Sequence, residues 1–180
     1  FFYNKGVNEK SLEPNSQDFG YCLGVLHHIT ETQKGIDSCF NILKKNSPFL
    51  IYLYYKFDNK PFWFKLIWKL TDFLRRFISR FPFPIKKIIT YIIALFIYLP
   101  LSRFSKLLKM INVDVKNFPL SDYKDKTFYF MRTDALDRFG TKLEKRFTKE
   151  EIKLMLLKSG FVDIQFSENT PYWVALAWKK

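Results

Sequence analysis

Cysteine and histidine are scarce in this chain, and their scarcity argues against several kinds of site. The 180 residues include two cysteines, Cys22 and Cys39, whose spacing fits neither a metal-ligand set nor a disulfide framework. A reducing cytoplasm is therefore the expected compartment. The two histidines, His27 and His28, are neighbours whose side chains would diverge on an extended strand, whereas a zinc site needs three or four ligands. We predict no bound metal.

Acidic residues are nearly absent from one segment. Residues 60–109 contain eleven Lys or Arg and a single acid, Asp72, whereas the rest of the chain is almost balanced in charge. Most of the formal net charge of +13 therefore belongs to this segment and needs a local explanation. With 48% hydrophobic and 19% aromatic residues the chain is not disordered, and its length suffices for a real core.

The chain also has no initiator Met and no signal peptide with a charged start and a cleavage site. It begins with Phe-Phe-Tyr, which is typical of the middle of a strand. We expect the sequence to be part of a longer protein, with a first strand at residues 1–4.

Two apolar runs separated by a helical pattern predict a βαβ unit. Residues 19–26 and 49–55 are nearly continuous apolar runs, as expected of strands in a parallel sheet. Between them, Thr30 is the predicted N-cap of a helix with apolar residues Ile36, Phe40 and Leu43 at helical spacing.

The end of the chain predicts a helix followed by two paired strands. Thr148 and Glu151 have the spacing of a capping box, and Gly160 ends the helix. Residues 162–167 and 172–178 are the predicted strands. Their connection is too short for a parallel return, so an antiparallel hairpin is favoured.

The basic segment lies in a predicted insert, residues 59–121, with two or three helical stretches separated by Pro82 and Pro84. Its apolar run at 88–101 is shorter than the 20 or so residues that a membrane span needs. Two interpretations stay open: helices in the membrane interface, with basic and aromatic flanks, or a helical cap whose apolar sides pack together. Nucleic acid is the least favoured partner, because long apolar stretches replace interleaved basic and stacking residues.

Two motifs resemble a known family. LGVLHHI at the end of the first long strand and RFTKEEIKLMLLKSGFVDIQF near the end of the chain are similar to the second half of a class I methyltransferase that uses S-adenosyl-L-methionine (SAM). The resemblance implies an α/β fold: an incomplete Rossmann-like sheet, mostly parallel with an antiparallel terminal strand, plus the α-helical insert. It divides the chain into a SAM-binding half (1–58), the insert (59–121) and a C-terminal core (122–180).

The chain departs from this family in its cofactor motifs. None of its six glycines forms the G-x-G turn that these enzymes use to bind SAM at a helix N-terminus, and the acid that holds the ribose has no counterpart. The resemblance implies that both lie upstream, so we expect these residues alone to be inactive. Gly6 takes the place of the acid that usually contacts adenine.

The resemblance also implies site residues at the strand ends. On the cofactor side these are Gly6, Val7, Cys22, Leu23 and His27, and on the acceptor side Tyr54, Arg132 and Asp134.

For His27, three alternatives stay open. The histidine pair could be the polar end of a buried strand with one ring bonded to backbone, His27 could line the pocket, or it could be a general base, because an unperturbed imidazole titrates near neutral pH. Arg132 and Asp134 lie in a charged stretch that could instead be a solvated turn. Cys22 and Leu23 could equally be ordinary core.

The predicted function is methyl transfer to a small-molecule, glycan or lipid-linked acceptor, with O-methylation favoured. The absence of an Asn- or Asp-Pro-Pro-aromatic motif after LGVLHHI counts against methylation of a nucleobase amino group. The alternative is a non-enzymatic membrane-surface protein. We expect a cytoplasmic location, with peripheral membrane contact through residues 60–110.

Overall fold

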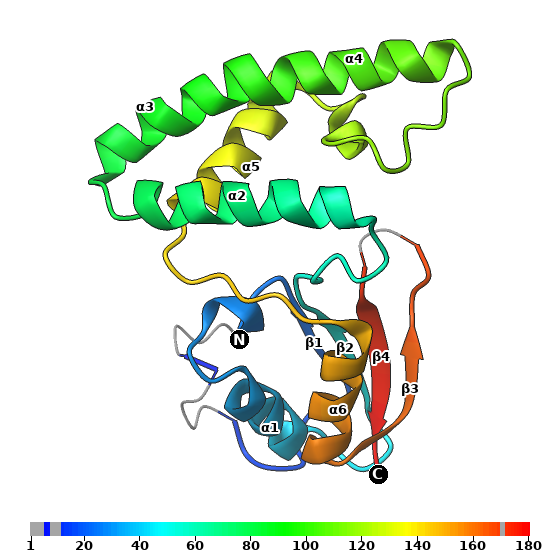
Figure 1. Ribbon diagram of the computed structural model, residues 1–180. Helices are drawn as coiled ribbons and strands as arrows, with labels where there is room; N and C mark the ends of the chain where they lie inside the picture. Colours follow the sequence, from blue (N-terminus) through cyan, green and yellow to red (C-terminus); the bar gives the residue numbers. More distant parts are fainter. Residues whose placement is uncertain (1–5, 8–11, 170–171) are drawn as a thin grey trace. The chain divides into compact units, whose positions relative to one another are not determined.

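A computed structural model of the chain describes residues 6–7, 12–169 and 172–180. The strand predicted at 1–4 lies outside these residues. The chain divides into two units, whose elements are labelled in Figure 1. We call Phe1–Asp58 with Leu143–Lys180 the sheet unit, and Asn59–Lys142 the helical unit. The predicted insert ends at residue 121, whereas the helical unit continues to Lys142.

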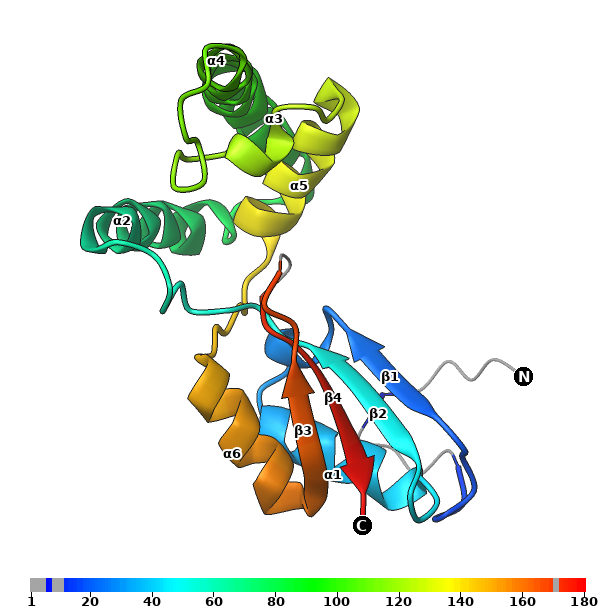
Figure 2. The same ribbon diagram turned by 90° about the vertical axis from the view of Figure 1, so that its right-hand side faces the viewer.

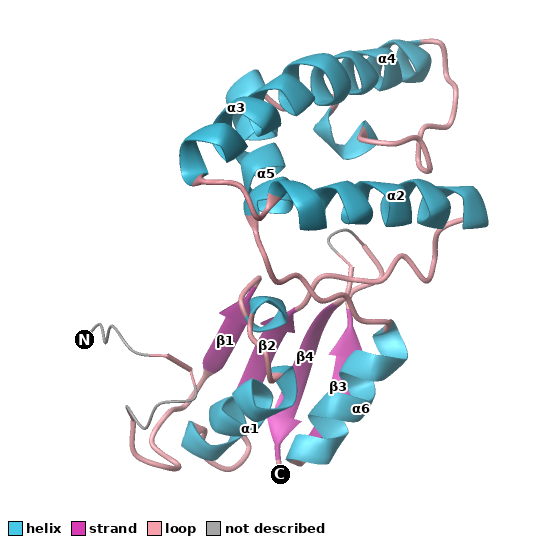
Figure 3. Cartoon of the chain, turned by 60° about the vertical axis from the view of Figure 1, so that its left-hand side comes forward, coloured by secondary structure: helices cyan, strands magenta, loops and turns pink. Residues whose placement is uncertain are grey.

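Four strands form the sheet of the sheet unit, in the order β1-β2-β4-β3 (Figure 3). β1 (Gly20–Leu23) and β2 (Pro48–Tyr52) are parallel, and β4 (Val174–Lys179) is antiparallel to both β2 and β3 (Phe161–Phe166). β3 therefore runs in the same direction as β1 and β2. The predicted methyltransferase-like α/β sheet, mostly parallel with an antiparallel terminal strand, is confirmed.

Two helices, α1 (Thr32–Ile42) and α6 (Lys149–Ser159), lie on one face of this sheet (Figure 2). The core between helices and sheet is made of fully buried apolar side chains, including Ile36, Phe49, Ile51, Leu156 and Phe161. On β1 the alternate side chains Tyr21 and Leu23 point to the other face and are exposed. Because β1 carries apolar side chains on both faces, its sequence alone does not determine which face carries the helices.

Local signals account for most of the element ends. Thr148 and Glu151 form the predicted capping box, and Gly160 ends α6 in a left-handed conformation. The N-cap of α1 is Glu31, so the prediction of Thr30 was wrong. β1 is shorter than predicted, because the chain turns into a 3-10 helix, η1 (Leu26–His28), which brings His27 out of the strand.

The helical unit holds α2 (Phe62–Ile78), α3 (Phe83–Ile93), η2 (Ala94–Tyr98), α4 (Leu99–Met110), η3 (Ser121–Tyr123) and α5 (Phe128–Gly140). α3, η2 and α4 form one continuous helix, in which η2 is a π-helical turn just before Pro100. Proline lacks the N–H that would continue the α-helical pattern, so an irregular turn at this point is expected. The core of the unit lies between this long helix and α5.

Candidate functional site

The carboxyl ends of the parallel strands β1 and β2 define the candidate site, because open α/β sheets bind ligands at this edge. After β1, Gly24 has a positive φ of 72° and leads the chain into η1. The Gly24 N–H donates to the Tyr52 carbonyl at 3.0 Å, which ties the ends of the two strands together. His27 and Tyr54 follow the two strands and lie against each other.

The rings of His27 and Tyr54 stack, with centroids 3.7 Å apart and planes at 25°. His27 is fully buried, and neither of its ring nitrogens has a hydrogen-bond partner among the residues that the structure describes. A buried polar group without a partner is unusual, and a missing ligand or water is a common explanation. This orphaned imidazole is the strongest sign of a site in the sheet unit.

The neighbouring histidine behaves differently. Nδ1 of His28 lies 2.8 Å from the Leu143 carbonyl oxygen, so one ring of the pair is bonded to backbone, as one interpretation of the sequence held. The His27 and His28 ring centroids are only 4.1 Å apart. The expectation that the two side chains diverge was wrong, because they lie on a 3-10 turn rather than on an extended strand.

The protonation state of His27 follows from its burial. Burial, together with the smaller effect of the positive charges of His28 and Arg146, lowers the pKa of His27 to about 3. The imidazole is therefore neutral at neutral pH, and the premise of an unperturbed imidazole does not hold. A general base works best with a pKa near the operating pH, so the catalytic role of His27 stays a prediction without support from its electrostatics.

Two charged residues that the sequence analysis did not single out complete this cluster. The Arg146 guanidinium lies 5.1 Å from the Tyr54 ring centroid and pairs with Glu144 at 2.8 Å, with side chains only 10% and 2% exposed. The Glu144 Oε2 atom is buried without a partner among the described residues. We call His27, Tyr54, Glu144 and Arg146 the strand-end cluster. A Glu and an Arg in a charged stretch before a helix read as surface residues, so the sequence carried little sign of them.

The other predicted cofactor contacts are spread over the sheet unit. Val7 is half-buried against the core, and Gly6 is exposed. Cys22 packs on the core side of β1, where burial raises the pKa of its thiol, whereas Leu23 is 47% exposed on the opposite face. Since adjacent strand residues face opposite sides, Cys22 and Leu23 do not line one wall.

These residues fit SAM only in part. The described residues offer an exposed apolar side chain at Leu23 and the ring of Tyr54, against which His27 is fully buried. The chain has no glycine-rich turn and no acid in place of Gly6 for the sugar or adenine. The cofactor contacts of this chain are therefore limited to one wall of a SAM site and stay predictions.

The predicted acceptor residues fall in different units. Tyr54 belongs to the strand-end cluster, whereas Arg132 and Asp134 lie on α5 of the helical unit. Asp134 accepts a hydrogen bond from the Tyr98 hydroxyl at 3.3 Å, and burial raises the pKa of its carboxyl. The interpretation of this stretch as a solvated turn was wrong, because it forms a helix with one buried face.

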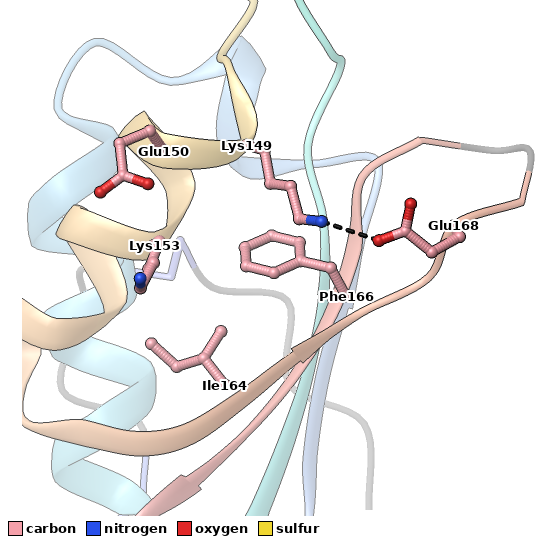
Figure 4. Close-up of a pocket in the computed structure, with 6 residues that line it drawn as sticks. All are labelled: Lys149, Glu150, Lys153, Ile164, Phe166 and Glu168. Atoms are coloured by element: carbon pink, nitrogen blue, oxygen red, sulfur yellow. Dashed lines mark hydrogen bonds and ion pairs between the residues drawn. The ribbon is translucent and has the colours of Figure 1, made fainter. Parts of the chain in front are cut away.

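A separate hollow lies between α6 and β3 (Figure 4). At its rim, Lys149 pairs with Glu168 at 2.8 Å, and both side chains are substantially exposed. β3 is the edge strand opposite β1, so this hollow is not part of the strand-end cluster. Across the described ranges, no three His, Cys, Asp or Glu side chains gather closely enough to hold a metal ion.

No protein-family model matches the sequence, and no curated protein matches it significantly. Among solved structures, the chain is similar to a SAM-dependent methyltransferase from Thermotoga maritima (12% identity, TM-score 0.44), covering 98% of this chain and 62% of that one. A SAM-dependent methyltransferase from Methanosarcina mazei is similar at 14% identity and a TM-score of 0.44, with 97% and 65% covered. A Bordetella parapertussis protein whose name gives no activity is similar at 12% identity and a TM-score of 0.47, with 97% and 42% covered.

The chain thus spans less than two thirds of each of these three proteins. Likenesses at this identity and TM-score carry no argument about activity. The class of fold rests instead on the strand order and strand directions of the sheet unit.

Proposed function

We propose that this chain forms the second half of the core of a SAM-dependent methyltransferase. The observation that carries the proposal is the sheet: two parallel strands joined through α1, then an antiparallel terminal strand inserted beside β2, as the family resemblance implies. The strand-end cluster lies where such sheets bind their ligands.

The residues of the strand-end cluster would bind and orient rather than react. When bound, SAM supplies a methyl group on a positively charged sulfur, and its transfer needs mainly alignment with the acceptor atom. His27 is fully buried against Tyr54, so it would position the Tyr54 ring rather than touch the ligand itself. Tyr54 offers an aromatic face, and the Arg146–Glu144 pair holds that face in place.

The finer function that we propose is O-methylation of a small-molecule, glycan or lipid-linked acceptor, by a cytoplasmic protein that contacts a membrane at its periphery. The composition of the helical unit supports a hydrophobic acceptor, because the surface of this unit is both basic and apolar. The alternative, a non-enzymatic membrane-surface protein, draws on the same unit. SAM binding separates the two.

The test is SAM binding by the protein as its complete gene encodes it, measured by calorimetry. His27→Leu removes both ring nitrogens and keeps an apolar side chain in the buried space, and we expect it to weaken SAM binding about tenfold, or about 1.4 kcal/mol. Lys153→Ala, an exposed residue at the far edge of the sheet unit, is the matched control and should leave binding unchanged. A complete protein that is folded and does not bind SAM would overturn the methyltransferase proposal.

A further inference from the structure

In the helical unit, α2 and the long helix formed by α3, η2 and α4 expose more large apolar side chains than the helices of an ordinary soluble domain do. A soluble helix buries its apolar stripe and exposes its polar face. Here most of the buried polar side chains of the described chain lie in this one unit, namely Asp72, Arg75, Ser79, Thr90, Ser102, Ser105 and Ser121. Most of the exposed large hydrophobic side chains also lie in it. The pattern needs an apolar environment outside the unit.

The long helix formed by α3, η2 and α4 shows this pattern most clearly. Its buried face carries small or hydroxyl-bearing side chains at intervals of three or four residues: Thr90, Ala94, Tyr98, Ser102 and Ser105. Its opposite face carries large apolar side chains that are about half to three-quarters exposed: Ile88, Ile92, Phe96, Phe104 and Leu107. Apart from Tyr98 and the partly buried Ile89, Ile93 and Leu99, small residues face the protein and large ones face outward, as in the packing of helices in lipid.

The length and burial of this helix indicate whether it would span a membrane or lie in the membrane interface. Phe83–Met110 runs for 28 residues, with a mean hydropathy of 1.7 in its most apolar stretch, of which only 28% is buried. A core helix of a soluble protein would be mostly buried. The uncharged part between Lys87 and Arg103 is roughly 22 Å long, shorter than a hydrocarbon core of roughly 30 Å. The helix therefore fits the membrane interface better than a span.

α2 also exposes a stripe of large apolar side chains, and basic residues border this stripe. Its exposed stripe consists of large apolar side chains three or four residues apart: Phe62, Leu66, Leu70, Phe73 and Phe77. Lys65, Lys69, Arg76 and Arg80 follow the same spacing along one side of that stripe. The side of α2 turned into the unit instead carries the Asp72–Arg75 ion pair, at 2.8 Å. An apolar stripe bordered by basic residues is the pattern of helices that bind anionic membranes.

We propose that the helical unit docks on an anionic lipid bilayer through two apolar stripes, one on α2 and one on the long helix, together called the lipid face. The charge of the helical unit favours lipid over a second copy of the chain as the partner of the lipid face. A copy would bring the same excess of Lys and Arg against residues 60–109, whereas anionic headgroups complement it. The proposal does not depend on the methyltransferase function.

The test is flotation of the complete protein with lipid vesicles. We expect binding to vesicles of phosphatidylcholine mixed with phosphatidylglycerol, little binding to phosphatidylcholine alone, and weaker binding at high salt, because screening removes the headgroup attraction. Phe96→Asp places a charge on a side chain that is 70% exposed and outside the core of the unit, and should weaken vesicle binding at least tenfold. The matched control is Leu154→Asp, a side chain 56% exposed on the sheet unit, which should not change it.

Several outcomes would overturn the proposal. One is a folded protein, verified by circular dichroism, that floats with neither kind of vesicle. Another is equal loss of binding in Phe96→Asp and Leu154→Asp. Resistance to extraction by alkaline carbonate would replace the interfacial position with a membrane span. A stable dimer in light scattering that Phe96→Asp dissociates, without vesicle binding, would assign the lipid face to a second copy.

Discussion

His27 makes the stability of the sheet unit depend on pH. Its pKa is about 3 in the folded protein and about 6.5 in an unfolded chain, so the native state resists protonation. The contribution of the neutral His27 ring to the free energy of unfolding is fully present above the unfolded pKa, and it is lost as the pH falls toward about 3. Linkage limits the loss to roughly 5 kcal/mol. The groups that face the ring are His28, Arg146 and Tyr54, of which the first two carry or gain positive charge.

The measurement is denaturant unfolding at neutral pH and at about pH 4, with His27→Leu beside the wild type. Carboxyl groups also titrate in this range, so the informative quantity is the difference between the two proteins. We expect the wild type to lose more stability than His27→Leu on acidification. Equal losses would show that His27 is protonated freely in the folded protein.

The Asp72 carboxylate makes two ion pairs, one with a buried arginine and one with an exposed arginine, so the contributions of the two pairs to stability can be compared. Asp72 pairs with Arg75 at 2.8 Å and with Arg76 at 2.9 Å, and the two Arg side chains are 5% and 69% exposed. Arg75 also donates to the Thr141 carbonyl. Arg75→Met removes the buried partner of the Asp72 carboxylate and should lower the free energy of unfolding by about 3 kcal/mol, the low end for a broken buried pair, because Arg76 still pairs with Asp72.

Arg76→Met should cost less than about 1 kcal/mol, because water screens an exposed pair. Denaturant unfolding of both variants checks the contrast. Similar losses of stability in the two variants would mean that the exposed pair with Arg76 stabilises Asp72 as much as the buried pair with Arg75 does.

At this scale the sequence predicted residue positions better than residue roles. The run 49–55 predicted a strand that contains Tyr54, whereas β2 ends at Tyr52 and Tyr54 follows it. The stacking of His27 on Tyr54 and the contact of Arg146 with Tyr54 join residues that are far apart in the chain. No local sequence pattern predicts such contacts. The lowered pKa of His27 depends on the same long-range burial.

At the scale of elements, Gly160 is the sharpest test. It ends α6 with a φ of +102°, and an added Cβ would lie 2.9 Å from Cζ of Phe40 in the core. Gly160→Ala combines strained backbone with this clash and should cost more than about 1 kcal/mol. Gly140→Ala is the control, because it ends a helix without a positive φ and its Cβ would meet only Leu136 at 3.5 Å.

Thermal unfolding distinguishes the two variants. The control should be neutral or slightly stabilising, since alanine restricts the unfolded chain without strain. A Gly160→Ala protein as stable as the wild type would mean that Phe40 moves aside and that the left-handed turn is not required.

Elements with both a periodic pattern and end signals were predicted correctly, as α6 shows with its capping box and glycine. α5 was missed, although Met131, Ala135 and Phe139 recur at helical spacing and form its buried face. Its charged residues drew the interpretation toward a solvated turn. The apolar face of α5 belongs to the core of the helical unit, which explains why this unit extends past residue 121.

At the scale of the whole molecule, the described residues form two hydrophobic cores that share no side chain. A unit with its own core can fold alone. The sheet unit is interrupted between Asp58 and Leu143, and its two segments meet beside the interruption. Tyr55 and Phe147 pair there as a parallel bridge, and the Lys56 N–H donates to the Phe147 carbonyl at 2.9 Å.

The independence of the two units gives the last prediction. Replacing residues 59–142 with a Gly/Ser linker of about eight residues provides a reach of roughly 26 Å, enough to rejoin two segments that already pair. The shortened protein should keep a cooperative unfolding transition and protected amides in α6, because its core loses no residue. It should also lose vesicle binding, because the lipid face is gone. Loss of the cooperative transition would show that the sheet unit needs the helical unit to fold, and vesicle binding by a folded sheet unit would move the membrane contact away from the lipid face.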